Sequence, residues 1–460
     1  MGLLKHLVLP VLIAVGAFVA YKSFQPKEKV LIEENGWFGA GKRRQDDTKI
    51  TPFEVAVPED TIKDLNERLQ KSRISHEPLE DANDFRYGFN ANYLKQVKEY
   101  WLTKFDWRKQ EKLLNQFKQF TTEIEGVKVH FYHAKPAAGK YKRVLPLLLV
   151  HGWPGNVFEF YKLIPRLVDP AAHGLPSDFA FEVIAPSIPG YGFSGQPKKR
   201  GFSQAAAARV FRKLMLRLGF NKFYLQGGDW GALILSNLAK LYPENVYGIH
   251  LNMLGAGFSG NFKAIALSFL GSFFPKQLFA HEHYHNFNFF SNFGNFIVES
   301  GYMHLQATKP DTVGTALNDS PIGLAAYILE KFSTWTNNDF IDLPDGGLTK
   351  KFTMDELLTI VTIYWTQGNI VSSQRFYREC FTDAENQKLA GVYLSVPTGH
   401  AHFKNELFDK EPPEISSTMY NLTSHTSFPD GGHFAAFEHP EWLSQHLFSF
   451  VGGLLNNKKK

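Results

Sequence analysis

The sequence has only one cysteine, Cys380, among its 460 residues. One thiol cannot close an internal disulfide, and it cannot supply a thiolate cluster for a metal ion. A disulfide scaffold and a cysteine-based zinc site are therefore both excluded, and this cysteine usage is typical of a reducing compartment.

An excess of charge of one sign is also lacking, because 50 basic residues against 45 acidic residues leave a net charge of +5. Such a small and scattered excess argues against a nucleic-acid partner. The sequence has no internal repeats, and its low-complexity sequence is confined to the lysines at 458–460. With 44% hydrophobic residues, the chain has the composition of a globular protein with two or three domains, or one large domain with insertions.

An uncharged and almost entirely apolar run covers residues 7–20, with lysines before and after it. With Leu3, Leu4 and Tyr21 added, the run approaches the about 20 residues that cross a bilayer. We expect residues 1–22 to be an uncleaved membrane anchor, and the excess of lysine after it predicts a cytoplasmic catalytic body. A cleaved signal peptide is the alternative.

Strand-like and helix-like segments alternate through much of the chain after residue 120. The strand-like runs are apolar throughout and are separated by helical runs, which indicates an α/β fold with a mostly parallel sheet covered on both faces. The helix predicted over 203–218 begins with the capping residue Ser203. Between about residues 254 and 387 this alternation gives way to aromatic-rich segments with helical periodicity. Ligands of open α/β sheets bind beyond the carboxyl ends of the strands, so we expect this insertion to cover the site as a lid.

These changes of pattern divide the chain into five predicted parts. They are a membrane anchor at 1–22, an N-terminal helical extension at 23–120, the first part of the α/β core at 121–257, a helical lid at 258–387, and the second part of the core at 388–460.

The sharpest local signal is the run Gly227-Gly228-Asp229-Trp230-Gly231, which lies between a predicted strand and a predicted helix. Small residues on both sides of the central position are typical of a nucleophile elbow, a sharp turn that exposes the central side chain. That position usually holds serine, but here it holds Asp229, and no G-x-S-x-G run occurs elsewhere. A carboxylate nucleophile predicts displacement at a strained or activated sp³ carbon, which gives an alkyl-enzyme ester. The alternative is that Asp229 only caps the helix.

Hydrolysis of such an ester needs backbone donors for the oxyanion. One candidate is the N–H of Trp230, directly after the nucleophile. The second is the N–H of Trp153 in the run 151–155, which follows the first buried strand. An ordinary Gly/Pro loop is the alternative interpretation of that run.

A base to activate water is predicted at His433, in the loop Gly431-Gly432-His433-Phe434 before the last helix. The order nucleophile, acid, base singles out His433 among the 17 histidines. The acid that orients the imidazole should follow the strand at 392–396. Glu406, Asp409 and Glu411 all qualify by position, and each could equally be a solvated charge.

The chain resembles the microsomal epoxide hydrolases, including the juvenile hormone epoxide hydrolase branch, within the α/β-hydrolase superfamily. The similarity runs from the N-terminal run to the final helix. It is carried by the blocks 151–155, 189–194, 226–231, 299–304, 308–311, 317–321, 330–335, 373–377 and 431–438.

The resemblance implies roles for five side chains. Asp229 would be the nucleophile, His433 the base and Glu406 the acid, by its spacing after Pro397-Thr398-Gly399. Tyr302 and Tyr377 match the tyrosine pair that hydrogen-bonds the epoxide oxygen. A phenol suits this task, because a pKa near 10 keeps it protonated at neutral pH and still able to donate. Lid packing is the alternative role for both tyrosines.

One departure from the family pattern is the polar run 400–405 before Glu406. Its His400 and His402 form an H-x-H pair, but no further ligand is evident nearby, so we interpret the pair as surface residues rather than a metal site.

We therefore predict a single-pass protein of the endoplasmic reticulum membrane that converts lipophilic epoxides to vicinal diols, with no cofactor and no metal. A haloalkane dehalogenase, with Trp230 holding the halide, is one alternative, and a non-catalytic lipid-binding protein on the same fold is another. Xenobiotic and juvenile-hormone-like epoxides both stay open as substrates, and so does the oligomeric state.

Overall fold

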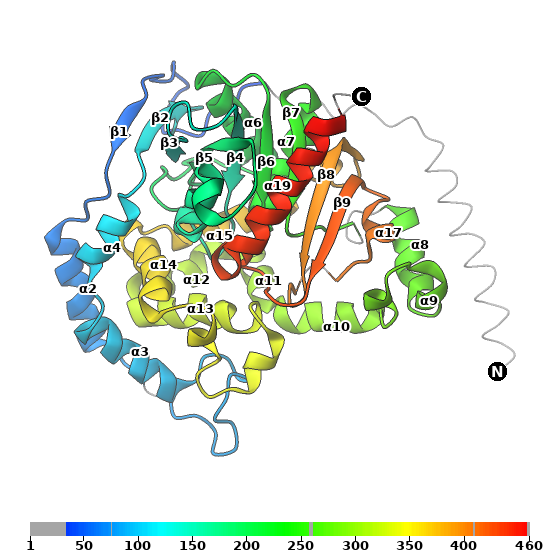
Figure 1. The fold of residues 1–460 in the computed structure, drawn as a ribbon. Coiled ribbons are helices and arrows are strands. Elements are labelled where there is room, and N and C mark those ends of the chain that lie inside the picture. The colour runs from blue at the N-terminus through cyan, green and yellow to red at the C-terminus, as the bar shows by residue number, and fades with distance from the viewer. Residues whose placement is uncertain (1–33, 75, 257–260, 408–409, 458–460) are drawn as a thin grey trace, which may run out of the picture.

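A single twisted sheet forms the centre of the computed structural model, which describes residues 34–74, 76–256, 261–407 and 410–457 (Figure 1). Within these residues the sheet has nine strands in the order β1-β2-β3-β5-β4-β6-β7-β8-β9. Neighbours from β5 to β9 pair in parallel, and β1, β2 and β3 continue the sheet antiparallel. The strands are β1 (Thr51–Phe53), β2 (Gln119–Ile124), β3 (Val127–Ala134), β4 (Arg143–Val150), β5 (Phe179–Pro186), β6 (Phe223–Gly227), β7 (Val246–Leu251), β8 (Leu394–Phe403) and β9 (Tyr420–Phe428). The predicted mostly parallel α/β sheet is confirmed.

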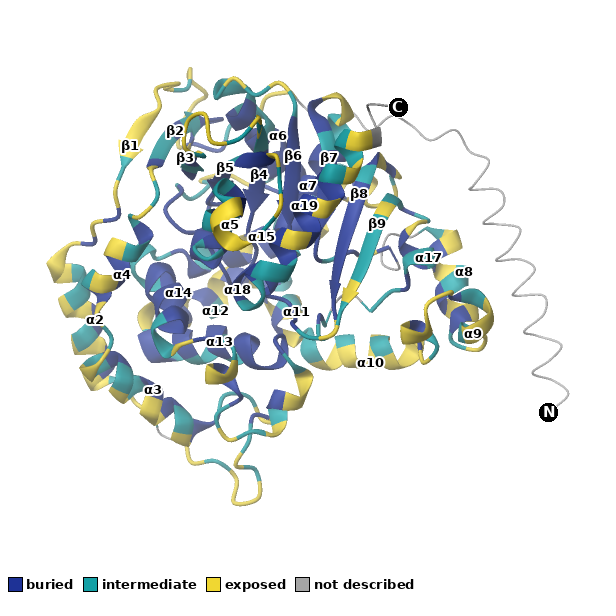
Figure 2. Ribbon diagram, viewed as in Figure 1, coloured by how far each residue is buried: buried dark blue, intermediate teal, exposed yellow. Residues whose placement is uncertain are grey.

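Helices cover both faces of the central strands, which Figure 2 shows as buried. Alternate residues of a strand point to opposite faces. Leu147 and Leu149 of β4 belong to one apolar cluster, with α5 (Leu163–Val168) and α19 (Pro440–Asn457). Leu148 and Val150 belong to the other, with α6 (Gln204–Arg217) and α7 (Asp229–Leu241). The predicted helix over 203–218 is confirmed, since the Ser203 side chain accepts the Ala206 N–H at the start of α6.

Nine α-helices lie between β7 and β8 within the described ranges, where the sequence pattern predicts an insertion. They are α8 (Phe262–Gly271), α9 (Pro275–Leu278), α10 (Phe289–Glu299), α11 (Gly301–Thr308), α12 (Pro310–Asp319), α13 (Pro321–Thr334), α14 (Met354–Gln367), α15 (Ile370–Thr382) and α16 (Ala384–Ala390). The N-terminal helices α2 (Glu59–Lys71), α3 (Ala91–Thr103) and α4 (Trp107–Leu114) pack against α13 and α14. Two further short helices are α17 (Pro413–Ser416), between β8 and β9, and α18 (Ala435–Glu438), between β9 and α19. The boundaries proposed for extension, core and lid stay predictions.

The interpretation of His400 and His402 as surface residues is wrong. β8 extends to Phe403, well beyond the predicted strand, and it lies between β7 and β9. Both imidazoles are therefore buried, with exposed fractions of 0% and 1%. Among the described residues no group of three or more His, Cys, Asp or Glu side chains could hold a metal ion.

The predicted localisation, a single-pass protein of the endoplasmic reticulum membrane, is corrected by the structure. No helix within the described ranges is both long enough and apolar enough to cross a membrane. The long helix α19, for example, has 18 residues but includes Glu441, Gln445 and His446. The segment predicted as the anchor, residues 1–22, lies outside the described residues.

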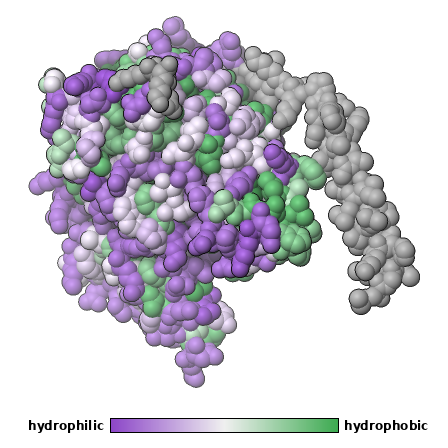
Figure 3. Space-filling view, turned by 45° about the vertical axis from the view of Figure 1, so that its right-hand side comes forward, coloured by the Kyte–Doolittle hydropathy of each residue, from purple (hydrophilic) through white to green (hydrophobic). Residues whose placement is uncertain are grey.

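Exposed apolar side chains gather on α8, on the turn after it and on α10. Figure 3 shows hydrophobic surface over this edge of the molecule. These side chains are Phe262, Ile265, Phe269, Leu270, Phe273, Phe274, Phe290, Phe293, Ile297 and Val298. Contiguous apolar surface of this kind is unusual on a soluble monomer.

A buried ion cluster joins the β2–β3 turn to α6. Arg209 donates from two nitrogens to the Glu125 carboxylate at 2.7 and 2.8 Å, and Lys213 Nζ donates to it at 2.7 Å. The side chains of Glu125 and Arg209 are only 2% and 5% exposed. Burial raises the pKa of Glu125, but the hydrogen bonds and charges of Arg209 and Lys213 outweigh it and hold that pKa below its ordinary value of 4.5.

Glu125→Gln should therefore lower the free energy of unfolding by about 3 kcal/mol at neutral pH, because it leaves two cations with a neutral partner. A lowered carboxyl pKa stabilises the fold above the unfolded-state value, and the contribution disappears as pH falls through the folded-state value. The difference from the parent should shrink in acid, as measured by denaturant unfolding at several pH values. Glu77→Gln, which breaks the exposed pair with Lys95, should cost less than about 1 kcal/mol. An equal loss in both variants would contradict the prediction.

Candidate active site

A sharp turn between β6 and α7 presents Asp229 at the carboxyl edge of the sheet. Asp229 has a φ of 46°, in the left-handed region that side chains other than glycine rarely adopt. A Cβ atom on Gly231 would lie 2.0 Å from the Val150 carbonyl oxygen, and one on Gly227 would lie 2.8 Å from Gly231 itself. Only glycine fits at both positions, so the strand, the turn and the helix together hold the strained Asp229 backbone.

The Asp229 carboxylate is held from two sides. The Trp153 N–H donates to its Oδ1 at 2.7 Å, and His433 Nε2 lies 3.4 Å from its Oδ2. A Cβ atom on Gly152 would lie 2.1 Å from Oδ1, so only glycine permits this approach. The Trp230 N–H belongs to the first turn of α7, where backbone donors lack partners within the helix. Both N–H groups predicted as oxyanion donors therefore lie beside the carboxylate or directly after it.

His433 lies between two carboxylates. Its Nδ1 donates to Glu406 at 3.0 and 3.1 Å, on the side of the ring opposite Asp229. The side chains of His433 and Glu406 are 2% and 0% exposed. Burial lowers the pKa of His433, but the charges and hydrogen bonds of Glu406 and Asp229 outweigh burial and raise this pKa well above its ordinary value. The imidazole is therefore a cation at neutral pH while Asp229 is charged.

The structure distinguishes among the three acids that the sequence offered as partners of His433. Glu406 contacts His433, whereas Glu411 accepts the Ala256 N–H at 3.0 Å. Asp409 lies outside the described residues. Glu406 lies in the turn just after β8, which ends at Phe403, and this turn brings it into contact with His433.

Tyr302 and Tyr377 lie across from the elbow, on α11 and α15. The Tyr302 ring stacks on Trp153 at 5.1 Å, and the Tyr377 ring meets Trp230 edge-on at 4.5 Å. The two phenol rings are 5.7 Å apart. Burial is the main cause that raises the pKa of both phenols well above the ordinary value of 10; the negative charge of Asp229 adds to it for Tyr302, and the neighbouring Tyr302 and then Asp229 add to it for Tyr377. Both hydroxyl groups therefore stay protonated at any physiological pH.

Sequence reasoning missed Glu159, a buried acid on the turn Val157–Phe160. Burial raises its pKa to about 8; the negative charge of Asp229 adds to this shift, and the positive charge of His433 opposes it. A cavity of ≈20 Å³, with room for about one water, is lined by Glu159, Gln226, Asp229, Asn252 and His433. The sequence signal was present, because Glu159 is the only acid in an aromatic run.

Glu438 was also missed, although it lies at the end of one of the matching blocks. Its carboxyl group accepts the N–H groups of Gly432 and Phe434, on either side of His433, at 2.9 Å each. Burial raises the pKa of Glu438 to about 8, against the effect of these two hydrogen bonds. Glu438 therefore fixes the loop that carries the histidine.

Comparison with known proteins gives consistent matches along the chain. Residues 50–160 match the family described as epoxide hydrolase N terminus, and residues 146–406 match the alpha/beta hydrolase fold. The chain is 50% identical over 433 residues to epoxide hydrolase 1 of Sus scrofa, covering 93% of this chain and 94% of that protein. It is 41% identical over 459 residues to juvenile hormone epoxide hydrolase 2 of Ctenocephalides felis, covering 98% and 96%.

A solved structure also matches over most of the chain. The crystal structure of juvenile hormone epoxide hydrolase from the silkworm Bombyx mori is similar with a TM-score of 0.87 and 40% identity. The match covers 93% of this chain and 100% of that chain.

The two carboxylates beside His433 allow a prediction about the pKa of its ring that does not depend on any reaction. The ring should stay protonated at pH about 7.5, since the pKa of His433 is raised, and Glu406→Gln should lower that pKa by removing one negative charge. Nitrogen NMR of the labelled ring across a pH series would measure both values. A raised histidine pKa stabilises the fold at low pH, and this contribution disappears as pH rises through the folded-state value. A ring that is already neutral at pH about 7 in the parent would contradict the assignment.

Proposed function

The chain belongs to the epoxide hydrolase family, and from this premise we propose that it opens lipophilic epoxides to vicinal diols through a covalent ester on Asp229. The observation that carries the proposal is the buried cluster of Asp229, His433 and Glu406 facing Tyr302 and Tyr377. A nucleophile, a base and two proton donors converge there on one small volume. Such a set can attack an epoxide carbon and protonate its oxygen at the same time.

The first step in this proposal is alkylation. An Asp229 oxygen attacks a ring carbon, the bond from that carbon to the epoxide oxygen breaks, and an ester forms. The developing alkoxide takes a proton from Tyr302 or Tyr377, which leaves a phenolate. The raised pKa values of both phenols support this role, because a phenol that never ionises at rest is always ready to donate.

Ester formation changes the charge around His433. Asp229 is neutral as an ester, so one of the two carboxylates that raised the pKa of His433 is lost. The imidazolium then returns a proton to the phenolate and becomes a neutral base, still oriented by Glu406. The alkylated enzyme therefore generates its own base, and the resting enzyme holds that base in its protonated form.

The second step is hydrolysis. Neutral His433 takes a proton from water, and the resulting hydroxide attacks the ester carbonyl of Asp229. The N–H groups of Trp153 and Trp230 stabilise the tetrahedral oxyanion. When the intermediate collapses, its new hydroxyl proton passes to the departing diol oxygen and the Asp229 carboxylate is restored with one oxygen from water. The ≈20 Å³ cavity beside Asp229, His433 and Glu159 supports this step, since it has room for the attacking water.

The two phenols favour an epoxide over a haloalkane. A halide leaves as a stable anion and needs no proton, whereas an alkoxide needs one. The aromatic rings favour a lipophilic substrate, because those of Trp153, Trp230, Tyr302, Trp335 and Tyr377 pack against one another beside the turn that carries Asp229.

His433→Gln should trap the ester, because alkylation needs no base and hydrolysis does. We expect steady-state diol formation to fall by about 10³-fold, while intact-protein mass spectrometry shows an added mass equal to that of the epoxide. His173→Gln, at an exposed position, is the matched control and should neither accumulate adduct nor lose turnover. Loss of turnover without an adduct would count against the ester.

Removal of the phenols should act on the earlier step. Tyr302→Phe and Tyr377→Phe should each slow adduct formation in single-turnover experiments by about 10²-fold, and the double variant should abolish it. Tyr327→Phe is the matched control, since its ring packs 6.0 Å from Trp153 but its hydroxyl meets Gln306 instead of the elbow. A double variant that forms adduct at the parental rate, or that releases bromide from haloalkanes faster than the parent opens any epoxide, would overturn the assignment.

A further inference from the structure

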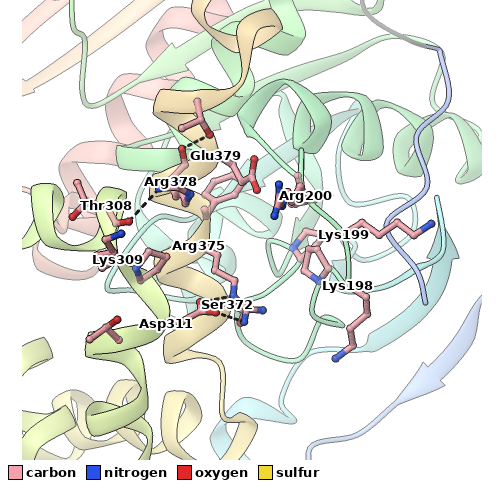
Figure 4. Close-up of a pocket in the computed structure, with 17 residues that line it drawn as sticks. Lys198, Lys199, Arg200, Thr308, Lys309, Asp311, Ser372, Arg375, Arg378 and Glu379 are labelled. Carbon is pink, nitrogen blue, oxygen red and sulfur yellow. Dashed lines mark hydrogen bonds and ion pairs between the residues drawn. The ribbon is translucent and has the colours of Figure 1, made fainter. Parts of the chain in front are cut away.

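A second cavity, of ≈630 Å³, lies between the loop before Phe202, the start of α12 and one face of α15 (Figure 4). It is distinct from the site above, since Asp229, Glu406 and His433 do not line it. Figure 4 shows Arg200 facing Arg378 and Lys309 across the cavity, while Lys198 and Lys199 extend outward; six cationic side chains line it in all. These are Lys198, Lys199, Arg200, Lys309, Arg375 and Arg378.

Positive charge in this cavity is mostly unbalanced. Two acids, Asp311 and Glu379, also line it. Asp311 is committed to Arg375, which donates from two nitrogens at 2.7 and 2.8 Å. Within the described residues the other five cations form no ion pair with a carboxylate. All six cations are exposed, so solvent screens their mutual repulsion, and the remaining excess of positive charge attracts an anion.

The first turn of α12 adds to the attraction for an anion. This helix has ten residues and begins at Pro310, and residues 308–312 line the cavity. Its dipole gives that end a partial positive charge, whereas Pro310 has no N–H and the Lys309 and Thr312 N–H groups are already bonded to carbonyl oxygens. Arg378 is fixed beside it, because its guanidinium donates to the Thr308 carbonyl oxygen at 3.1 Å.

The inner wall of the cavity is apolar. Phe202 and Phe376 are each 3% exposed and lie 6.1 Å apart, and proline rings at 189, 197 and 310 also contribute. Rings that are 3% exposed leave little surface for a ligand, so the cationic rim selects the ligand and calls for an anionic group. The volume lies within the range of sites for small organic ligands.

We propose that this cavity binds a phosphate-bearing ligand, with the phosphate between Arg200, Lys309 and Arg378. Five unpaired cations exceed what one carboxylate needs, whereas a phosphate carries two charges and several acceptor oxygens. The source is either a free organic phosphate or the headgroup of a phospholipid, and both present the same chemistry.

The proposed site is connected to the elbow through two rings. Phe376 precedes Tyr377 on α15, and it meets Trp230 edge-on at 5.4 Å. The ligand would therefore contact the helix that carries one of the two phenols. Binding itself requires no epoxide chemistry, so it is tested separately from the proposed reaction.

Equilibrium binding of pyrophosphate to the full chain, measured by calorimetry at low and at moderate salt, tests the site. A parallel assay measures co-sedimentation with phosphatidylcholine vesicles that contain or lack a phosphoinositide. We expect saturable binding of at least one probe that weakens as salt rises. Preference for pyrophosphate identifies a free phosphate as the ligand, and preference for phosphoinositide vesicles identifies a headgroup.

The double variant Arg200→Ser, Lys309→Ser should weaken the preferred probe about fivefold or more. Serine is a favourable capping residue at position 309, so α12 should persist. The control Lys112→Ser, Lys142→Ser removes the same charge from exposed positions outside the cavity and should bind like the parent. Equal weakening in both double variants, or no saturable binding of either probe at low salt, would overturn the proposal.

Discussion

The site depends on one electrostatic arrangement, in which the His433 imidazolium is buried between the carboxylates of Glu406 and Asp229. A buried cation is costly unless it is paired, and here it has two partners on opposite sides. Because one partner is also the proposed nucleophile, the charge state of the base follows the covalent state of Asp229. The same three side chains therefore supply both stability in the resting protein and the timing of the proposed second step.

Backbone geometry makes that arrangement possible. The close approaches of Gly231 to Val150 and of Gly152 to the Asp229 carboxylate leave no space for a Cβ atom, so the elbow and the run 151–155 meet at contact distance. Glu438 then fixes the loop that carries His433, because its carboxyl group accepts hydrogen bonds from the backbone of that loop. The helices between β7 and β8 close the remaining side with aromatic rings, which exclude water and strengthen the charge interactions within.

Much of the proposed site comes from the sequence, since the elbow run and the chain order single out Asp229 and His433 without any contact information, and the two side chains lie 3.4 Å apart in the structure. Glu406 could not be chosen from its own sequence context, because the choice depends on where β8 ends. Tyr302 and Tyr377 came from family resemblance alone, as two among 18 tyrosines. Glu159, and the burial of His400 and His402, were missed because polar residues inside a sheet or an apolar turn are stabilised by tertiary contacts that composition does not record. The membrane prediction rested on residues 1–22, and no spanning helix is present among the described residues.

Oxygen tracing tests most directly whether Asp229 forms the covalent intermediate. After a single turnover in heavy-oxygen water, an ester mechanism predicts an unlabelled diol and one heavy oxygen in the peptide that contains Asp229. After repeated turnover the carboxylate should approach full exchange. A diol that carries the label from its first turnover, together with an unlabelled Asp229 peptide, would show that water attacks the epoxide directly and would contradict the mechanism.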